Sequence, residues 1–166
     1  MKHLNYYLSL AEKGNADAAF EAAKIMFDDK CHDFIVQSML RKAAMLGNVK
    51  AQCWLGFLCL DNRLIDSTST FSEIKYVEDY SVAFDWFKKA ACCEDTLAMF
   101  ALYKCLQLGI GVEKSPEKAD VILNSIAQDL SYDMLPLMLF FDTLRKSIPP
   151  VRSVEYKTII RELLAS

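Results

Sequence analysis

The sequence predicts an all-α protein, a solenoid of stacked helix–turn–helix repeats. The first reason is a complete repeat near residues 91–126, where two helical patterns flank a glycine turn. The second reason is that the same pattern of small residues returns at several places along the chain. The third is composition. A hydrophobic content of 53%, with only five glycines and four prolines in 166 residues, favours a continuous helical core over a loop-rich β protein.

The segment 91–126 is predicted to hold two helices joined by a turn. Apolar residues recur at three- and four-residue steps from Leu97 to Leu108, as on one face of a helix. Gly109 can take the left-handed conformation that ends a helix. Ser115 and Pro116 suit the N-cap and the first position of the second helix. Two short helices cannot bury both apolar faces against each other, so such a unit needs neighbouring repeats.

The same frame recurs upstream. Each copy has an anchor alanine, a polar residue four positions later and a second alanine seven positions later. The anchors are Ala11, Ala44 and Ala91, and a decayed copy starts at Ala127. Successive anchors are 33, 47 and 36 residues apart, which is the spacing of helical-repeat proteins.

These segments resemble the Sel1-like repeats, a family related to the tetratricopeptide repeats. The resemblance is carried by LAEKGNADAAFEAA, AAMLGNVKAQCWLGFL, FDWFKKAA and LGIGVEKSPEKA. The chain departs from the family pattern at Glu94, where glycine is usual, and only the third repeat has the full Gly-x-Gly-Val turn. The resemblance implies a right-handed stack of helical hairpins that binds another protein on its concave side. It implies no catalytic residues.

We expect one solenoid domain over the whole chain. Its predicted parts are an N-terminal half-repeat cap (1–10), repeat 1 (11–43), repeat 2 (44–90) with an inserted loop (61–79), repeat 3 (91–126), and a degenerate repeat or C-terminal cap (127–166).

The insertion at 61–79 is the largest irregularity. Its Ser67–Thr70 core is rich in side chains that bond to their own backbone. Insertions in repeat proteins are often where partners bind. The alternative is a tolerated, mobile loop, because lengthening a loop costs little free energy. Phe71, Ile74, Tyr76 and Val77 favour a functional loop slightly, and they have the alternative of folding back on the solenoid.

Charge and hydropathy exclude several classes of protein. The formal net charge is −3 and the basic residues are scattered, so we expect no nucleic-acid partner. No apolar stretch approaches the roughly 20 residues of a membrane span. The N-terminal segment is too polar for a secretory signal, so we expect a cytoplasmic protein. The six cysteines fall at irregular repeat positions, which favours free thiols over a disulfide framework.

No catalytic motif is recognisable, so we expect no enzyme and no cofactor. The two histidines are His3, near the N-terminus, and His32, in a short polar turn. Cys31 and His32 with nearby aspartates suggest a metal site at first. Adjacent ligands in one turn cannot surround a tetrahedral ion, so we interpret this segment as a solvated turn.

The remaining candidate is the concave groove lined by the first helix of each repeat. By analogy with tetratricopeptide packing, three phenylalanines would form its floor and three lysines its rim. The predicted partner-binding residues are Asp17, Phe20, Lys24, Lys50, Phe57, Phe100 and Lys104, with Phe71 and Tyr76 from the insertion. The alternative is that the phenylalanines belong to the core in a slightly rotated register.

The predicted function is a non-enzymatic adaptor or regulator that binds a partner protein, as a monomer or weak homodimer. The alternative is an immunity-type inhibitor that neutralises one toxic effector. The identity of the captured partner, or an adjacent toxin gene, would discriminate between these two. A binding fold does not by itself name its ligand.

Overall fold

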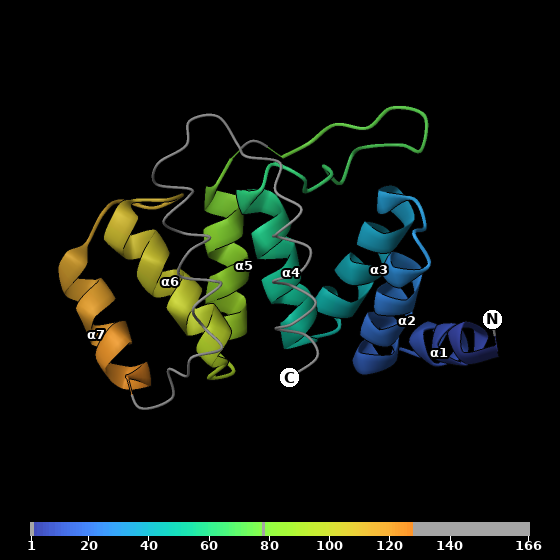
Figure 1. The fold of residues 1–166 in the computed structure, drawn as a ribbon, viewed down its shortest axis with the longest axis horizontal. Helices are drawn as coiled ribbons and strands as arrows, with labels where there is room; N and C mark the ends of the chain where they lie inside the picture. The colour runs from blue at the N-terminus through green and yellow to red at the C-terminus, as the bar shows by residue number, and fades with distance from the viewer. Residues whose placement is uncertain (1, 78, 128–166) are drawn as a thin grey trace.

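The computed structural model describes residues 2–77 and 79–127, and these residues form seven α-helices and no strand. The helices are α1 (Lys2–Glu12), α2 (Ala16–Asp28), α3 (Asp33–Met45), α4 (Val49–Leu60), α5 (Ser81–Ala91), α6 (Thr96–Leu108) and α7 (Pro116–Ile126). Each helix packs mainly against the helices before and after it, and Figure 1 shows them ranged in a row from α1 to α7. The predicted all-α repeat fold is confirmed.

The row contains two kinds of helix. We call α2, α4 and α6 the first-helix row, because each opens a repeat, and α1, α3, α5 and α7 the second-helix row. The pairs α2–α3, α4–α5 and α6–α7 make the most extensive contacts and are the helical hairpins. The degenerate repeat or cap predicted for 127–166 lies outside the described residues, apart from Ala127.

The spacing of the sequence frame reflects a repeated helix cap. The polar residue four positions after each anchor is the N-cap of a first-row helix, and its side-chain oxygen accepts a hydrogen bond from the backbone N–H three residues on. The three bonds are each 2.8 Å long and join Ala18 N to Asn15, Ala51 N to Asn48, and Ala98 N to Asp95. All three alanines are buried, so the frame fixes both the start of the helix and its packed face.

The turn before each cap requires a left-handed backbone. Gly14 has φ 86° and Gly47 has φ 97°. The third repeat has Glu94 at this position, and Glu94 also adopts a positive φ of 60°. At this position the chain therefore differs from the family pattern in its residue but keeps the left-handed backbone conformation. That conformation strains a residue that has a Cβ atom.

No helix in the described part of the chain is long and apolar enough to cross a membrane. The same residues contain no group of three or more histidine, cysteine or acidic side chains placed to hold a metal ion. All six cysteines are free thiols. Burial raises the pKa of Cys59 to about 11 and that of Cys105 to about 12, so both thiols stay protonated near neutral pH.

Candidate functional site

The predicted aromatic floor of the groove is wrong, because its three phenylalanines belong to the core. Phe20 and Phe57 are each 3% exposed and Phe100 is 1% exposed. Each ring packs against another aromatic ring: Phe20 against Trp54 (6.2 Å between centroids), Phe57 against Phe87 (4.9 Å), and Phe100 against Tyr103 (5.6 Å). Ring pairs at these distances are favourable beyond their buried area. For Phe20 and Phe57 the partner ring lies on another helix, which favours the inward direction of both side chains.

Two of the predicted rim lysines occupy equivalent places and cover these rings. The Lys24 Nζ lies 5.8 Å from the centroid of Phe20, and the Lys104 Nζ lies 5.8 Å from the centroid of Phe100. Lys24 also forms an ion pair with Glu21 at 3.2 Å, and Lys104 donates to Gln107 at 3.3 Å. The lysine stems and charges thus cap buried aromatics and are half-buried themselves.

The other two predicted groove residues are exposed but differ in role. Lys50 lies in the first turn of α4 and points to solvent. Asp17 accepts a hydrogen bond of 2.8 Å from the Asn48 side chain, which caps the first helix of the next repeat. Asp17 therefore connects two adjacent repeats. The groove residues predicted from the sequence lie along one row of helices, but they do not form an exposed aromatic surface.

The insertion is ordered as a short hairpin, which we define as residues 64–77. Ile65 and Tyr76 form an isolated antiparallel bridge. It is flanked by backbone hydrogen bonds from Asp66 N to Lys75 O (2.7 Å) and from Val77 N to Leu64 O (2.8 Å). Leu64 and Ile65 are buried, so the base of the hairpin is part of the core. Figure 1 shows this segment extending from the end of α4 toward the start of α3.

A buried glutamine on α3 fixes the hairpin to the solenoid. The Gln37 Nε2 donates to the carbonyl of Arg63 at 2.8 Å, and the Gln37 Oε1 accepts from the N–H of Ile65 at 2.8 Å. One side chain thus satisfies two backbone groups at the start of the hairpin, as a strand partner would. An ion pair between Arg63 and Asp33 at 3.1 Å lies beside it. Sequence reasoning missed Gln37, although a polar residue between Val36 and Leu40 on the inward face was a usable signal.

The tip of the hairpin is held by its own polar side chains. The Asp66 carboxylate accepts from the Thr68 N–H at 2.7 Å and from its hydroxyl at 2.5 Å. These two bonds lower the pKa of Asp66, so the turn is fully formed near neutral pH. Ser69 bonds both the N–H and the C=O of Lys75, which closes the end of the hairpin. The prediction that this core bonds to its own backbone is confirmed.

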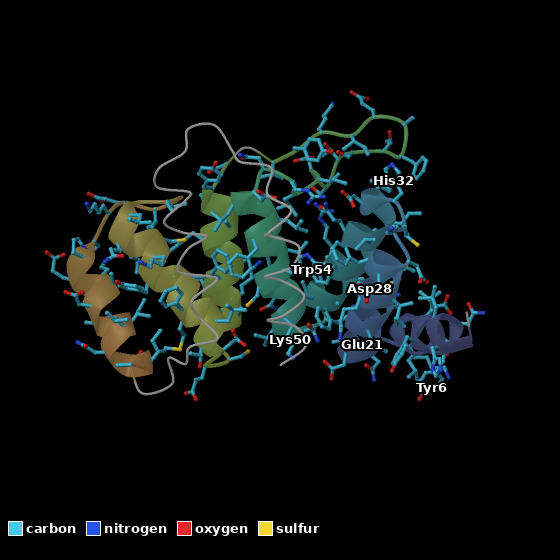
Figure 2. The ribbon with its side chains drawn as sticks, in the orientation of Figure 1. Tyr6, Glu21, Asp28, His32, Lys50 and Trp54 are labelled. Atoms are coloured by element: carbon cyan, nitrogen blue, oxygen red, sulfur yellow. The ribbon has the colours of Figure 1, made fainter. Side chains whose placement is uncertain are left out.

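The hairpin presents two large aromatic side chains to solvent. Phe71 is 61% exposed and Tyr76 is 54% exposed. The Phe71 ring also contacts His32 (4.8 Å between centroids) and Phe34 (6.1 Å), at the start of α3. Figure 2 labels His32 beside the end of the hairpin. We call Phe71, Tyr76, His32 and Phe34 the hairpin surface. Of the residues predicted to bind a partner, Phe71 and Tyr76 are the two aromatics that stay accessible.

His32 has a structural role that the sequence did not reveal. Its Nδ1 accepts a hydrogen bond of 3.2 Å from the N–H of Phe34, so it is the N-cap of α3. The imidazole therefore connects the start of α3 to the ring of Phe71. His32 is exposed, as the interpretation of this segment as a solvated turn predicted. The turn also supports the hairpin, because the His32 ring contacts the Phe71 ring.

Comparisons with known proteins give one informative match. No family model matches the chain, and no curated protein matches it. The solved structure of a Sel1 repeat protein from Oxalobacter formigenes is similar, with a TM-score of 0.67 and 23% sequence identity. The match covers 84% of this chain and 98% of that one. The chain therefore has the Sel1-like repeat fold that its sequence frame predicted.

Proposed function

We propose that the protein is a non-catalytic protein-binding module and that its partner binds on the hairpin surface. The observation that carries this proposal is that the hairpin is firmly attached to the solenoid while its aromatic side chains remain exposed. Gln37 holds the base of the hairpin through one buried and one partly buried hydrogen bond, while Phe71 and Tyr76 remain more than half exposed. An insertion that served only to connect two helices would not need this support.

The physics of protein recognition favours such a surface. Aromatic side chains dominate the binding energy of interfaces because they bury a large area with few rotatable bonds. Binding also costs conformational entropy for every group that must be ordered. At the hairpin surface much of this cost is met during folding, because Phe71 already packs on His32 and Phe34. A partner gains the contact area without ordering a loop.

The lysine rim is a weaker candidate for the main contact. Lys24 and Lys104 are engaged with buried aromatic rings, and the predicted floor between them is not accessible. Charged groups at a rim contribute more to steering than to affinity. We therefore assign the anchoring contacts to the hairpin surface and leave the rim a secondary role.

The test is capture of partners by the tagged full-length protein from its native lysate, followed by mass spectrometry. The variant is Phe71→Ser combined with Tyr76→Ser. The matched control is Met45→Ser, because Met45 is 83% exposed at the opposite end of α3. Circular dichroism and thermal melting verify that both variants fold.

We expect one dominant partner that the wild type and the control retain and that the double variant loses. Equal retention by the double variant would contradict the hairpin surface as the site. The identity of the partner then assigns the module a role: a toxic effector makes it an inhibitor, and any other protein makes it an adaptor or regulator.

A further inference from the structure

The hairpin consists of a first arm, residues 64–70, and a second arm, residues 73–77. Every second residue of the second arm forms a backbone hydrogen bond with the first arm: Glu73 with Thr70 (3.0 and 3.2 Å), Lys75 with Asp66 (2.7 Å) and Val77 with Leu64 (2.8 Å). Successive residues of an extended chain direct their backbone groups to opposite sides. The N–H and C=O groups of Ile74 and Tyr76 therefore point away from the first arm. We call these backbone groups the outer edge.

The outer edge is unpaired. Neither Ile74 nor Tyr76 forms a backbone hydrogen bond with any of the described residues. Backbone donors and acceptors in folded proteins nearly always have a partner, either in the protein or in water. A row of unpaired groups along an extended segment is the template on which another chain can pair.

The opposite edge of the hairpin is already occupied. Ile65 and Tyr76 face each other in the antiparallel bridge, and the hydrogen bonds between the arms flank them, so the Ile65 N–H points outward from the first arm. Gln37 on α3 accepts from this N–H at 2.8 Å. The order across the hairpin is thus α3, first arm, second arm and outer edge. The outer edge faces away from α3, and Figure 1 shows the hairpin beyond the ends of α3 and α4.

Two kinds of side chain flank the outer edge. Ile74 and Tyr76 project to one face of the second arm, and Tyr76 is more than half exposed. Lys75 projects to the other face and forms an ion pair of 3.2 Å with Glu73. Both charged side chains are more than 60% exposed, and ion pairs of this kind are weak. Lys75 therefore remains available to a second acidic group.

The charge of Lys75 disfavours a second copy of this chain as the occupant. An antiparallel pairing of two copies satisfies the whole outer edge of both only when Ile74 of each copy bonds to Tyr76 of the other. Lys75 then lies directly opposite Lys75 of the other copy. Like charges placed directly opposite destabilise a pair of strands, and lysine is a common protection of edges against self-association. The complementary occupant carries an acidic residue at this place.

We propose that a partner protein adds an extended segment to the outer edge in antiparallel orientation, with an acidic residue opposite Lys75. The residues on either side of that acidic residue lie opposite Ile74 and Tyr76 and are apolar. This inference rests on the proposed function, because Tyr76 belongs to the hairpin surface, and it gives the partner an apolar–acidic–apolar triplet. In such pairing the backbone bonds provide affinity, and the flanking side chains provide selectivity.

The test uses the full-length protein and a phage-displayed library of short random peptides as the probe. Enriched peptides are synthesised, and their affinities are measured for the wild type and for variants. Ile74→Pro removes one N–H of the outer edge and obstructs an incoming chain, but it removes no bond between the arms. Ile74→Thr is the matched control, because it keeps the N–H and the β-branched shape. Slow hydrogen exchange of the Val77 amide verifies that the hairpin is intact in both variants.

A second measurement leaves the protein unchanged. The backbone nitrogens of an enriched peptide are methylated one residue at a time, and the affinity of each methylated peptide for the wild type is compared. A segment paired along one edge uses the N–H of every second residue. Binding should therefore weaken at alternate positions of the peptide. Hydrogen exchange of the Ile74 and Tyr76 amides should also become slower when the peptide binds.

We expect the enriched peptides to share the triplet and to bind Ile74→Pro roughly tenfold more weakly than Ile74→Thr, or weaker still. Equal binding to these two variants would overturn the proposal, and so would methylation effects that do not alternate. The absence of any enriched peptide would overturn it too. Slower exchange of the Ile74 and Tyr76 amides on raising the protein concentration without peptide would assign the outer edge to a second copy instead.

The variant Phe71→Ser combined with Tyr76→Ser separates this inference from the proposed function. Peptides that bind Ile74→Pro normally but are lost by the double variant would leave the hairpin surface as the binding site and exclude pairing at the outer edge. Peptides that bind both variants normally would contradict both proposals. Where no peptide is enriched, capture from the native lysate still decides the role of the hairpin surface.

Discussion

Gly56 on α4 faces the ring of Phe87 on α5 so closely that a Cβ atom at Gly56 would lie 2.6 Å from the Phe87 Cε1. Phe87 is fully buried and also contacts the ring of Phe57. The ring therefore occupies the space that any side chain at position 56 would need. This contact sets the distance between the two helices of the second repeat.

Replacing Gly56 with alanine is expected to destabilise the protein by about 1–3 kcal/mol, the usual cost of overpacking a core. The higher helix propensity of alanine offsets part of this cost. The measurement is the free energy of unfolding in denaturant. The added variant Phe87→Leu should make Gly56→Ala less costly, because leucine leaves room for the new methyl group. Additive effects of the two substitutions would show that the ring and the methyl group do not collide.

Glu94 offers a stabilising substitution. It holds a φ of 60° at the position where the other two repeats have Gly14 and Gly47. This conformation destabilises a residue with a Cβ by about 1–2 kcal/mol, whereas glycine destabilises the folded state by about 0.5–1 kcal/mol through its additional loss of chain entropy. Glu94→Gly should therefore stabilise the protein by about 0.5–1 kcal/mol, measured by denaturant unfolding.

The converse substitution is the control for Glu94. A Cβ at Gly47 would meet no atom within 4 Å, so Gly47→Ala tests the backbone strain without a steric clash. We expect it to destabilise by about 1 kcal/mol. If both substitutions lowered stability, the carboxylate of Glu94 would have a favourable role that outweighs its backbone strain.

Gln37 is expected to control the order of the hairpin. Gln37→Leu keeps the volume but removes the partners of two backbone groups, the Arg63 carbonyl and the Ile65 N–H. Each buried group left without a partner costs about 1–3 kcal/mol. Hydrogen exchange of residues 64–77 should become faster in this variant, while exchange in α6 and α7 stays unchanged. Unchanged protection of the hairpin would mean that its packing alone holds it.

The sequence determined the helical repeats well because their signals are local. The caps at Asn15, Asn48 and Asp95 act within three residues, so a single repeat carries the information for its own helix start. The direction in which Phe57 points is different, since it depends on the ring of Phe87 thirty residues away. Helical spacing alone is compatible with Phe57 facing either the groove or the core. The sequence analysis predicted that it faces the groove.

The hairpin shows the same division between local and distant information. Its polar tip was predictable, because Asp66 and Thr68 bond to each other. Its attachment to the solenoid was not, because the bonds of Gln37 join α3 to a segment 26 and 28 residues later. The position of Phe71 over His32 follows from that attachment. The sequence therefore singled out Phe71 and Tyr76, but it predicted neither their neighbours His32 and Phe34 nor the support from Gln37.

Asp61 predicts a specific dependence of stability on pH. It follows directly on α4, and burial raises its pKa from 3.8 to about 6, with the nearby Arg63 opposing part of the shift. Because the folded state holds this proton more tightly than the unfolded state does, its contribution to stability is complete below about pH 3.8. That contribution is lost as the pH rises through 6. Near neutral pH the buried carboxylate is a net cost.

Asp61→Asn removes this titration while keeping the size of the side chain. We expect the variant to be more stable than the wild type at pH 8 by an amount of order 1 kcal/mol. The difference should shrink as the pH falls toward 4. Comparing the two proteins at each pH cancels the contribution of the other carboxylates, including Asp66 and Asp79, whose pKa values are lowered. A difference that is constant from pH 4 to pH 8 would mean that Asp61 titrates as in the unfolded chain, and its burial at the end of α4 would then need another partner.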